Sequence, residues 1–370
     1  MVLRKHLKNY INGQKFKSLK LIKKVHRNRN ITLEHTLLEA FKKMDVLDKK
    51  LLIVLDNDKF AGLLSAGDIQ RAVIQNKSLD IKVEEILRKN IRIATPSDKF
   101  DVVKKMMLEF RMELCPVVNL EKEIVEVYFW EDIFVNQEME PFHNFDLPVI
   151  IMAGGYGTRL RPLTHVIPKP LIPIKDKTML EEIFMRFSKY GSNRFFVSIN
   201  YKAELIKYYL KEQRLDYNIK YFVEEQPMGT AGSLSLLKNI IKETFFVTNC
   251  DILIEEDYSE ILEYHQKNNN EITVVAALKN YEIPYGTIET KENGELIKLE
   301  EKPDLTIKIN SGMYILEPHL IQEIPDDDFF HITHLIEKVK ERDGKVGVFP
   351  VSEKSWMDMG EWEKYIKMIN

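Results

Sequence analysis

The sequence predicts an α/β fold in the larger, C-terminal part of the chain and a smaller α+β duplication before it. Beyond residue 147, short apolar runs typical of strands alternate with helical patterns. Such alternation implies a mostly parallel sheet covered by helices on both faces. Before residue 137, one stretch of the chain aligns without gaps on a later stretch. A chain of 370 residues is expected to form two or three domains rather than one core.

The composition is that of an ordinary globular protein and excludes several classes of function. Apolar residues make up 44% of the chain and charged residues 30%, which argues against disorder. The formal net charge is −3, so nucleic acid is not expected as a partner. The two cysteines, Cys115 and Cys250, lie in no Cys-x-x-Cys or Cys/His metal spacing. We therefore expect neither a disulfide framework nor a zinc site.

The N-terminal segment, residues 1–17, is basic and is assigned no function. Lys and Arg are frequent from Arg4 through Arg29, a pattern typical of a solvated helical face, although it also suits a membrane surface or phosphate groups. No apolar run long enough for a signal peptide or a membrane span follows it. We therefore expect a cytoplasmic protein without a membrane partner.

Residues 18–136 contain a tandem duplication, in which Leu51–Ile69 aligns with Cys115–Ile133. Each copy is predicted to run from a short strand, near Ile31 or Ile93, through an amphipathic helix and a β-hairpin to a closing Asp-Ile. Because one such β-α-β-β-α unit leaves a sheet face bare, we expect the copies to pack together. The copies are placed at about residues 18–78 and 79–136.

The duplicated pattern resembles the paired CBS domain, a regulatory module that often binds adenine nucleotides between its halves. In that family a Ser or Thr at the end of the hairpin and an Asp three residues on hold the ribose, which the resemblance places at Ser65 and Asp68. In the second copy Phe129 replaces the Ser, and Asp132 alone remains. Both aspartates also suit helix caps. For Asp68 the roles of helix cap and nucleotide ligand both remain open, and for Asp132 the role of helix cap is favoured.

Residues 137–147 are predicted to connect the two parts, because they lose periodicity and include Pro141. A domain of residues 148–370 follows. Its strand-like runs, which have helical patterns between them, are Val149–Met152, Arg194–Ile199, Tyr221–Val223, Phe245–Thr248 and Ile272–Ala277.

The strongest local signal is VIIMAGGYGTRLRPLT, residues 149–164, in which a buried strand leads into three glycines and a Thr-Arg pair. Glycines let backbone N–H groups approach phosphate oxygens, and Arg159 adds a charge-assisted contact. The loop is not a Walker loop, and Leu160 occupies the place of the last glycine in GxGxxG. Taken alone, such a turn is more often an ordinary strand-to-helix connection, so its meaning depends on the motifs that follow.

Five further segments follow this loop in a definite order: Pro168–Pro170, Glu225–Gly232, Thr248–Asp251, Glu300–Pro303 and Trp356–Gly360. Together with Tyr285–Thr287 and Asn310–Gly312 they resemble the sugar-1-phosphate nucleotidyltransferase family over nearly all of residues 148–370. The resemblance implies a Rossmann-like, mostly parallel mixed sheet of the GT-A-like kind. It also implies transfer of a nucleoside monophosphate from a nucleoside triphosphate to a sugar 1-phosphate.

In this reaction an oxygen of the sugar phosphate attacks the α-phosphorus in line, and pyrophosphate leaves. Phosphoryl transfer of this kind needs positioning and charge neutralisation rather than covalent catalysis. The nucleophile is already an anionic oxygen, so no general base is required. The lack of a Ser-His-Asp or Cys-His signature is therefore no objection.

By this resemblance Arg159 and Lys169 are the catalytic residues. Arg159 holds the triphosphate and stabilises the departing pyrophosphate, while Lys169 neutralises charge on the α-phosphate. Asp251 and Asp358 supply carboxylates to Mg²⁺, which prefers oxygen ligands. Asp251 also suits a cap at a strand-to-helix turn, and Cys250 stands where the family commonly has Gly.

The resemblance also assigns the residues that bind substrate. Lys302 holds the phosphate of the sugar, Glu301 contacts its hydroxyls, Gly286 leaves room for the ring, and Asn310 belongs to the same group. A Lys before a Pro also suits a solvated strand end. Gln226 and Gly229 line the base pocket. The full nucleotide-binding set implied is Ala153, Gly154, Gly155, Gly157, Thr158, Gln226, Gly229 and Thr230.

The GTAG sequence after Pro-Met, together with the N-terminal duplication, resembles the guanylyltransferase branch of the family. In particular it resembles the glucosamine-1-phosphate guanylyltransferases, which make GDP-glucosamine for bacterial legionaminic acid. GTP and glucosamine 1-phosphate are therefore the expected substrates. UTP-, CTP- or dTTP-dependent transferases and mannose-1-phosphate guanylyltransferases share the same phosphate and metal residues and remain alternatives. The sequence leaves open whether the protein forms a homo-oligomer.

A different class of hypothesis is a sensor that binds nucleotide and sugar nucleotide without turnover. A protein that only binds has no need of charges aimed at a leaving pyrophosphate. The residues that argue against the sensor on this ground are Arg159, Lys169, Asp251, Lys302 and Asp358.

Overall fold

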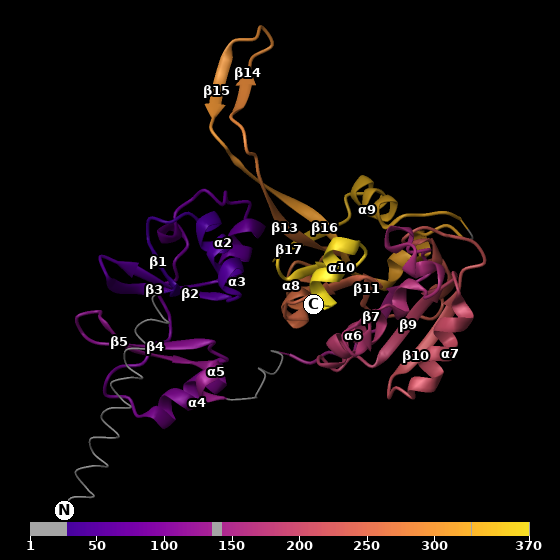
Figure 1. Cartoon of the computed structure of the whole chain (residues 1–370), viewed down its shortest axis with the longest axis horizontal. Coiled ribbons are helices and arrows are strands. Elements are labelled where there is room, and N and C mark those ends of the chain that lie inside the picture. The colour runs from indigo at the N-terminus through magenta and orange to yellow at the C-terminus, as the bar shows by residue number, and fades with distance from the viewer. Residues whose placement is uncertain (1–27, 135–142, 327, 370) are drawn as a thin grey trace, which may run out of the picture. The chain divides into compact units, whose positions relative to one another are not determined.

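The structure is a computed structural model that describes residues 28–134, 143–326 and 328–369. The chain divides into two compact units between Glu140 and Pro141, and each unit is described by itself (Figure 1). The predicted basic segment at residues 1–17 lies outside the described residues. None of the helices in the described part combines the length and the apolar character that a membrane crossing requires.

The first copy of the N-terminal duplication has the predicted order β-α-β-β-α. Strand β1 (Asn30–Thr32) is followed by helix α2 (Leu37–Leu47), the hairpin of β2 (Leu51–Asp56) and β3 (Lys59–Ser65), and helix α3 (Ala66–Ile74). Strand β1 pairs parallel with β2, and β2 pairs antiparallel with β3. The three strands therefore form one small sheet.

The second copy repeats the helix and the hairpin but not the first strand. Its elements are α4 (Phe100–Phe110), β4 (Leu114–Val118), β5 (Ile124–Phe129) and α5 (Trp130–Ile133). The strand expected near Ile93 is reduced to a single parallel bridge between Ala94 and Val117. Pro96 follows this bridge closely, and proline cannot donate a hydrogen bond to a strand ladder.

The two copies share one hydrophobic core, as the bare sheet face predicts. Ile53 and Leu63 of the first copy and Leu114 and Phe129 of the second belong to one cluster of buried side chains. The N–H of Phe60, in the first hairpin, donates to a carbonyl of the second hairpin 2.7 Å away. Each copy therefore covers apolar surface that the other would leave in water.

The C-terminal unit is built on a seven-stranded sheet. In chain order the strands are β6 (Val149–Met152), β9 (Arg194–Ile199), β10 (Asn218–Val223), β11 (Phe245–Asn249), β13 (Ile272–Glu282), β16 (Asp304–Leu316) and β17 (Val346–Ser352). They lie in the order β10-β9-β6-β11-β16-β13-β17. Neighbouring strands are parallel except where β16 pairs with β11 and β13. The predicted mostly parallel mixed sheet is therefore confirmed.

Alternate side chains of the central strands enter two different cores, because successive residues of a strand point to opposite faces. On β6, Val149 and Ile151 lie in one core and Ile150 in the other. On β11, Phe246 enters the first core, and Phe245 enters the second. Burial on both faces explains why these strands are continuous apolar runs.

Helices and 3₁₀ segments cover both faces of this sheet (Figure 1). The first core contains side chains from α6 (Met179–Ser188), α7 (Ala203–Gln213), α8 (Tyr258–Lys267) and α10 (Trp362–Ile369). The second contains side chains from α9 (Ile332–Glu341) and the 3₁₀ segments η5 (Gly232–Leu237) and η6 (Pro318–Glu323). Helices α2, α3 and α6 each begin with a capping box, in which a hydroxyl and a carboxylate satisfy free backbone N–H groups.

Short elements complete the units. They are the 3₁₀ segments η1 (Val83–Glu85), η2 (Thr158–Leu160), η3 (Leu163–His165) and η4 (Lys169–Leu171), and the strands β7 (Pro173–Ile174), β8 (Lys177–Thr178), β12 (Ile252–Ile254), β14 (Thr287–Thr290), β15 (Leu296–Glu300) and β18 (Trp356–Asp358).

The strand order changes direction between β6 and β11. From β6 the chain moves outward through β9 to β10, and β11 then pairs with the other side of β6. The carboxyl ends of β6 and β11 therefore border one crevice. In open α/β sheets, ligands bind at such a point, so a site is expected at the residues that follow Met152 and Asn249.

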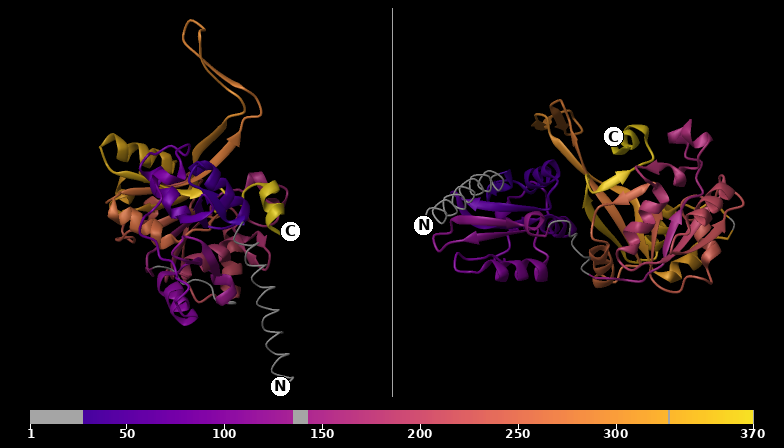
Figure 2. Two further views of the ribbon diagram at one scale, coloured as in Figure 1. Left: turned by 90° about the vertical axis from the view of Figure 1, so that its left-hand side faces the viewer. Right: turned by 60° about the horizontal axis from the view of Figure 1, so that its bottom comes forward.

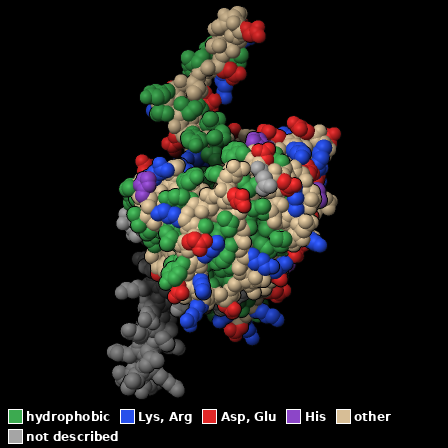
Figure 3. All heavy atoms as spheres, turned by 90° about the vertical axis from the view of Figure 1, so that its right-hand side faces the viewer, with side chains coloured by type: hydrophobic (Ala, Val, Ile, Leu, Met, Phe, Trp, Pro, Cys, Tyr) green, Lys and Arg blue, Asp and Glu red, His purple; other side chains and the backbone are tan. Residues whose placement is uncertain are grey.

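Strands β13 and β16 continue beyond the sheet and carry a projecting hairpin arm made of β14 and β15 (Figures 1 and 2). Several of its apolar side chains are in water, among them Ile288 (65% exposed) and Leu299 (61%), and hydrophobic side chains are visible along it in Figure 3. Strands β14 and β15 form a two-stranded sheet of their own. A ribbon of two strands has little stability of its own.

Buried His265 is expected to make the C-terminal unit sensitive to mild acid. Its side chain is 1% exposed, and its Nδ1 and Nε2 lie 2.8 Å from Thr273 Oγ1 and 3.1 Å from Glu317 Oε1. Burial lowers the pKa of His265, although Glu317 opposes this. The unfolded chain therefore binds a proton at a higher pH than the folded chain does, and stability falls as the pH drops below about 6.5.

We expect the melting temperature of wild type to fall between about pH 7.5 and pH 5.5, and that of His265→Gln to fall less over the same interval. Scanning calorimetry at both values measures this. The control is His319→Gln, because the side chain of His319 is 55% exposed. Equal falls in wild type and His265→Gln would contradict the assignment.

Candidate active site

Two adjoining clefts lie at the carboxyl ends of β6 and β11. Their volumes are about 320 Å³ and 180 Å³. Arg159, Asn249 and Asp251 line both clefts, so the two form one continuous site. It occupies the switch point of the sheet, where the fold predicts a ligand.

The loop after β6 forms one wall of the larger cleft through Gly154, Gly155 and Gly157. Gly157 has a φ of +62°, and a Cβ there would lie 2.8 Å from Thr164 Cγ2 and 3.1 Å from Lys169 Cβ. The hydroxyl of Thr164 donates to the carbonyl of Gly157 at 2.9 Å. Glycine is therefore required at this position, and its close packing places Lys169 beside the loop.

Opposite charges meet at the centre of the site. The ammonium of Lys169 forms an ion pair with the carboxylate of Asp251. The guanidinium of Arg159 lies 3.5 Å from Asp251 and 3.6 Å from Asp358. The two aspartates are only 5% and 8% exposed, and buried carboxylates need such partners. The four residues therefore form one charge network.

The two carboxylates are brought together by a small antiparallel pair of strands. Strand β12 pairs with β18, which places Asp358 close to the residue that precedes β12, Asp251. A Cβ on Gly360 would lie 2.5 Å from Asp251 Oδ2 and 2.9 Å from Asp358 Oδ1. Both oxygens therefore lie beside one point, and the glycine at 360 is what leaves room for them.

The donor set of this centre fits Mg²⁺. Asp251 and Asp358 offer hard oxygen ligands on the wall of an open cleft, and Mg²⁺ takes one or two protein carboxylates while keeping water and phosphate oxygens as its other ligands. The neighbouring Cys250 is buried, and burial raises the pKa of its thiol to about 12. It therefore stays protonated near neutral pH in the absence of a metal.

The far end of the larger cleft is lined by Pro227, Met228, Gly229, Thr230 and Phe329. Gly229 has a φ of +79°, and a Cβ there would lie 2.7 Å from the carbonyl oxygen of Phe330. The N–H of Phe330 donates to the carbonyl of Met228 at 3.0 Å. This end therefore has firmly held, largely apolar walls, which suit a nucleobase better than a phosphate.

Comparison with known proteins decides the family. Residues 148–370 match the family model described as Nucleotidyl transferase, which is more than half of the chain. The chain belongs to the nucleotidyl transferase family. The predicted family is thereby confirmed for this range.

The most similar relatives include mannose-1-phosphate guanylyltransferases. The chain is 35% identical over 185 residues to the catalytic subunit beta from Dictyostelium discoideum, which covers 48% of this chain and 52% of the relative. It is 31% identical over 231 residues to the subunit of the same name from Danio rerio, covering 60% and 63%. The chain thus spans between about half and two thirds of the length of these relatives.

Among solved structures, HddC from Yersinia pseudotuberculosis matches with a TM-score of 0.48 and 27% identity, over 60% of this chain and 98% of that chain.

The nucleotidyl transferase domain gathers most, but not all, of the nucleotide-binding residues expected from its sequence. Gly154, Gly155, Gly157, Gly229 and Thr230 line the larger cleft. Three expected residues do not line it, and they are Ala153, Thr158 and Gln226. Ala153 is buried beneath the loop, and its N–H donates to the carbonyl of Ser198 at 3.0 Å.

Sequence reasoning missed Glu224, which lines the larger cleft and is 5% exposed. It stands between the predicted strand Tyr221–Val223 and the motif that begins at Glu225, and it belonged to neither. A lone Glu at the end of a strand run carries no sign of burial, so no local pattern marked it. Phe329 was also missed, since no motif surrounds it.

The four residues expected to bind the sugar phosphate are separated in the structure. Asn310 lines the smaller cleft, and its Oδ1 accepts a hydrogen bond from the hydroxyl of Tyr314 at 2.9 Å. Gly286, Glu301 and Lys302 lie at the base of the hairpin arm, where a Cβ on Gly286 would lie 2.9 Å from Glu301 Oε2. These three residues line neither cleft.

The residues expected to bind a regulatory nucleotide serve partly as caps. Ser65 and Asp68 form the capping box of α3, and Asp68 also pairs with Arg71 and with Arg88, whose Nε is 2.8 Å away. Asp132 is exposed in the first turn of α5. The N-cap residue of α5 is Phe129, whose side chain forms no capping hydrogen bond. Asp132 is therefore not the N-cap residue of this helix.

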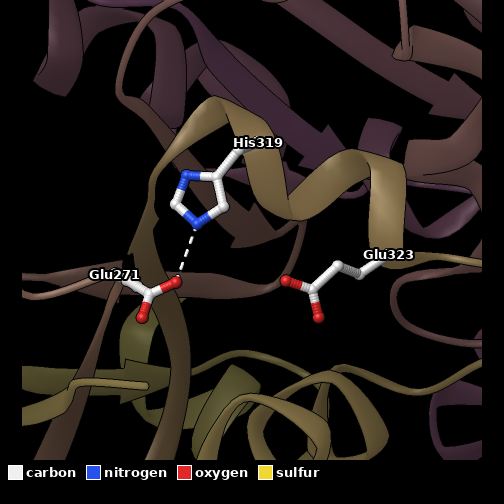
Figure 4. A group of neighbouring side chains, drawn as sticks. All are labelled: Glu271, His319 and Glu323. Atoms are coloured by element: carbon white, nitrogen blue, oxygen red, sulfur yellow. Dashed lines mark hydrogen bonds and ion pairs between the residues drawn. The ribbon is translucent and has the colours of Figure 1, made fainter. Parts of the chain in front are cut away.

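A second group that resembles a metal site lies elsewhere in the C-terminal unit and consists of Glu271, His319 and Glu323 (Figure 4). His319 Nε2 lies 2.7 Å from Glu271 Oε2. Arg342 donates to Glu271 at 3.0 Å and to Glu323 at 2.7 Å, and the hydrogen bond from Arg342 lowers the pKa of Glu271 to about 2. Because Arg342 donates to both carboxylates, this group is an ion-pair cluster.

We expect Gly360→Ala to lower nucleotidyl transfer about ten- to a hundredfold, because the added methyl group forces Asp251 and Asp358 apart and small misplacements are costly. The rate of pyrophosphate release, followed against Mg²⁺ concentration, measures this, and the half-saturating Mg²⁺ concentration should rise. An unchanged melting temperature establishes that the variant is folded. A rate and Mg²⁺ dependence equal to wild type would rule out the shared metal position.

Proposed function

We propose that residues 148–370 transfer GMP from GTP to a hexose 1-phosphate and release pyrophosphate. The observation that carries this proposal is the meeting of a glycine loop, two cations and two buried carboxylates at one site. A site that only bound nucleotide would need the glycine loop but not both pairs of charges. The sensor hypothesis is therefore the weaker one.

The charge network suggests how the triphosphate is received. Arg159 is 55% exposed in its side chain, and its ion-pair distances to the aspartates are long, between 3.5 and 3.6 Å. Phosphate oxygens in the cleft would give Arg159 shorter, charge-assisted contacts. Asp251 and Asp358 would then hold Mg²⁺, which neutralises the phosphate charge when bound. The two cations remain to stabilise the pyrophosphate as it leaves.

The acceptor needs no activation by the protein. A sugar 1-phosphate carries its own anionic oxygen. The task of the site is therefore to align the phosphate oxygen with the α-phosphorus and to exclude water.

Two observations support the choice of substrates. Relatives named mannose-1-phosphate guanylyltransferase support GTP and offer mannose 1-phosphate as an acceptor. The resemblance to enzymes that make GDP-glucosamine for legionaminic acid supports glucosamine 1-phosphate. Lys302, Glu301 and Gly286 remain the proposed contacts for the sugar phosphate.

The first test is pyrophosphate release with Mg²⁺, for GTP, UTP, CTP, ATP and dTTP, each with mannose, glucosamine and glucose 1-phosphates. We expect GTP to give the highest rate, and Asp251→Asn to lower that rate at least about 100-fold, because a neutral amide holds Mg²⁺ at the transferring phosphate less tightly than a carboxylate. Glu361→Gln is the matched control, because Glu361 is 49% exposed at the rim, next to Arg159. It should keep nearly the wild-type rate.

Three other outcomes would overturn parts of this proposal. A preference for another nucleotide would refute guanylyl transfer but keep nucleotidyl transfer. Equal losses in Asp251→Asn and Glu361→Gln would remove Asp251 from the proposed metal site. No release from any pair, with tight nucleotide binding intact, would favour the sensor.

We further propose that the N-terminal unit acts as a CBS pair and binds an adenine nucleotide beside Ser65 and Asp68. Two arginines next to Asp68, Arg71 and Arg88, support this because they offer charge to phosphate groups. The second copy offers Asp132 alone, so we propose one nucleotide site.

We expect millimolar AMP or ATP to raise the melting temperature of the full chain by a few degrees, through binding to the folded state, and to change the rate of pyrophosphate release. The ligand-induced shift should vanish in Asp68→Ala and persist in Asp132→Ala, its counterpart in the second copy. Each shift is compared with the same variant without nucleotide, since Asp68→Ala also loses a cap. The absence of any shift in wild type would refute the site.

A further inference from the structure

Two aromatic side chains line the larger cleft in the described part of the chain, Tyr156 and Phe329. Tyr156 belongs to the glycine loop. The next residue, Gly157, packs on Lys169, so Tyr156 lies toward the phosphate end. Phe329 comes from the segment before α9 and lies at the end of the cleft that suits a nucleobase. No phosphate or metal contact of the proposed reaction uses this second ring, so its place in the cleft needs another reason.

The segment that carries Phe329 is fixed to the loop of residues 228–232 by backbone hydrogen bonds. The N–H of Phe330 donates to the carbonyl of Met228 at 3.0 Å. The carbonyl of Phe330 accepts from two N–H groups of the same loop, at 3.0 and 2.9 Å. The position of Phe329 is therefore set by backbone pairing with the loop that forms the base end of the cleft.

The ring of Phe329 has a face available to a ligand. Its neighbour Phe330 packs against the second core, whereas Phe329 is 55% exposed and lines the cleft. The rings of Phe329 and His331 lie 4.7 Å apart between centroids, at an interplanar angle of 78°. An edge-to-face contact of this kind uses at most one face of the phenylalanine ring. A lone exposed phenylalanine is ordinary on a protein surface, but this one lies in the active-site cleft.

A phenyl ring offers a nucleobase a flat apolar surface and no hydrogen bond. Every base has a π-face, so stacking on an aromatic side chain strengthens binding about 5- to 100-fold for any base. The base is not a reacting group, so a stack is equally favourable in the ground state and in the transition state. Such a contact lowers KM and leaves kcat unchanged.

We propose that Phe329 stacks on the nucleobase of the nucleoside triphosphate and so holds the nucleotide by the end that carries no charge. This inference rests on the proposed function and adds a contact to the face of the base. It is distinct from Gln226 and Gly229, which the resemblance assigned to the base pocket. Phe329 contributes to binding and takes no part in the chemical step.

The test is the steady-state kinetics of Phe329→Ala with GTP, Mg²⁺ and the hexose 1-phosphate that gives the highest rate. We expect KM for GTP to rise about 5- to 100-fold, with kcat within about twofold of wild type. Phe329→Leu keeps apolar bulk without a ring and should also raise KM, whereas Phe329→Trp keeps a ring and should not. The matched control is Tyr208→Ala on α7. Tyr208 is 66% exposed and lines neither cleft, so both constants should stay unchanged.

Two binding measurements separate stacking from structural support. Inorganic tripolyphosphate carries phosphate charge but no base, so its inhibition constant against GTP should be the same in wild type and Phe329→Ala. The tryptophan fluorescence of Phe329→Trp should be quenched by GTP more strongly than that of wild type, and tripolyphosphate should produce no such difference. Equal weakening of GTP and tripolyphosphate in Phe329→Ala, or an unchanged KM for GTP, would overturn the inference.

The wild-type nucleotide panel keeps this inference separate from the proposed function. If wild type prefers another nucleotide, guanylyl transfer fails, and the Phe329 variants are measured with that nucleotide, because every base has a face to stack. If wild type prefers GTP but Phe329→Ala keeps the wild-type KM, the proposed function stands and only the role of Phe329 is refuted. If no pair of substrates reacts, equilibrium binding of GTP to wild type and Phe329→Ala decides the role of the ring.

Discussion

The parallel pairing of β6 with β11 is the constraint on which the site depends. Its register sets Met152 opposite Asn249, and the N–H of Cys250 continues the ladder by donating to the carbonyl of Met152 at 3.2 Å. The glycine loop and Asp251 therefore leave the sheet at the same level. Both strands are buried on both faces, so a shift in register would move apolar side chains from one core to the other. The cores thus fix the geometry of the charged centre.

The ion pairs of the charged centre explain how two buried carboxylates are tolerated. Lys169 and Arg159 compensate Asp251 and Asp358. On the proposed function, a nucleotide brings anionic oxygens and a divalent cation together, so partners are exchanged rather than lost. Little net charge has to be buried at any stage, which keeps the desolvation cost low.

Sequence patterns predicted the sheet, the glycine loop and the family, because each depends on local residue order. Continuous apolar runs such as VIIM required burial on both faces, and the structure has two cores. Glu224 was missed because its burial results from packing between β9, β10 and the loop. The strand predicted near Ile93 is reduced to one bridge for a local reason, the nearby Pro96. The placement of Lys302 depends on how far β13 and β16 extend, and no local pattern encodes that length.

The hairpin arm has a consequence for how this protein can diverge. Its side chains lie outside both cores of the C-terminal unit, so substitutions there change few of the contacts that determine global stability. At Gly157, in contrast, the loop has no room for one extra methyl group. Evolution can therefore vary the arm at little cost to folding while the nucleotide end stays nearly fixed. With the sugar-phosphate contacts on the arm as proposed, new acceptors are accessible to such a scaffold more readily than new donors.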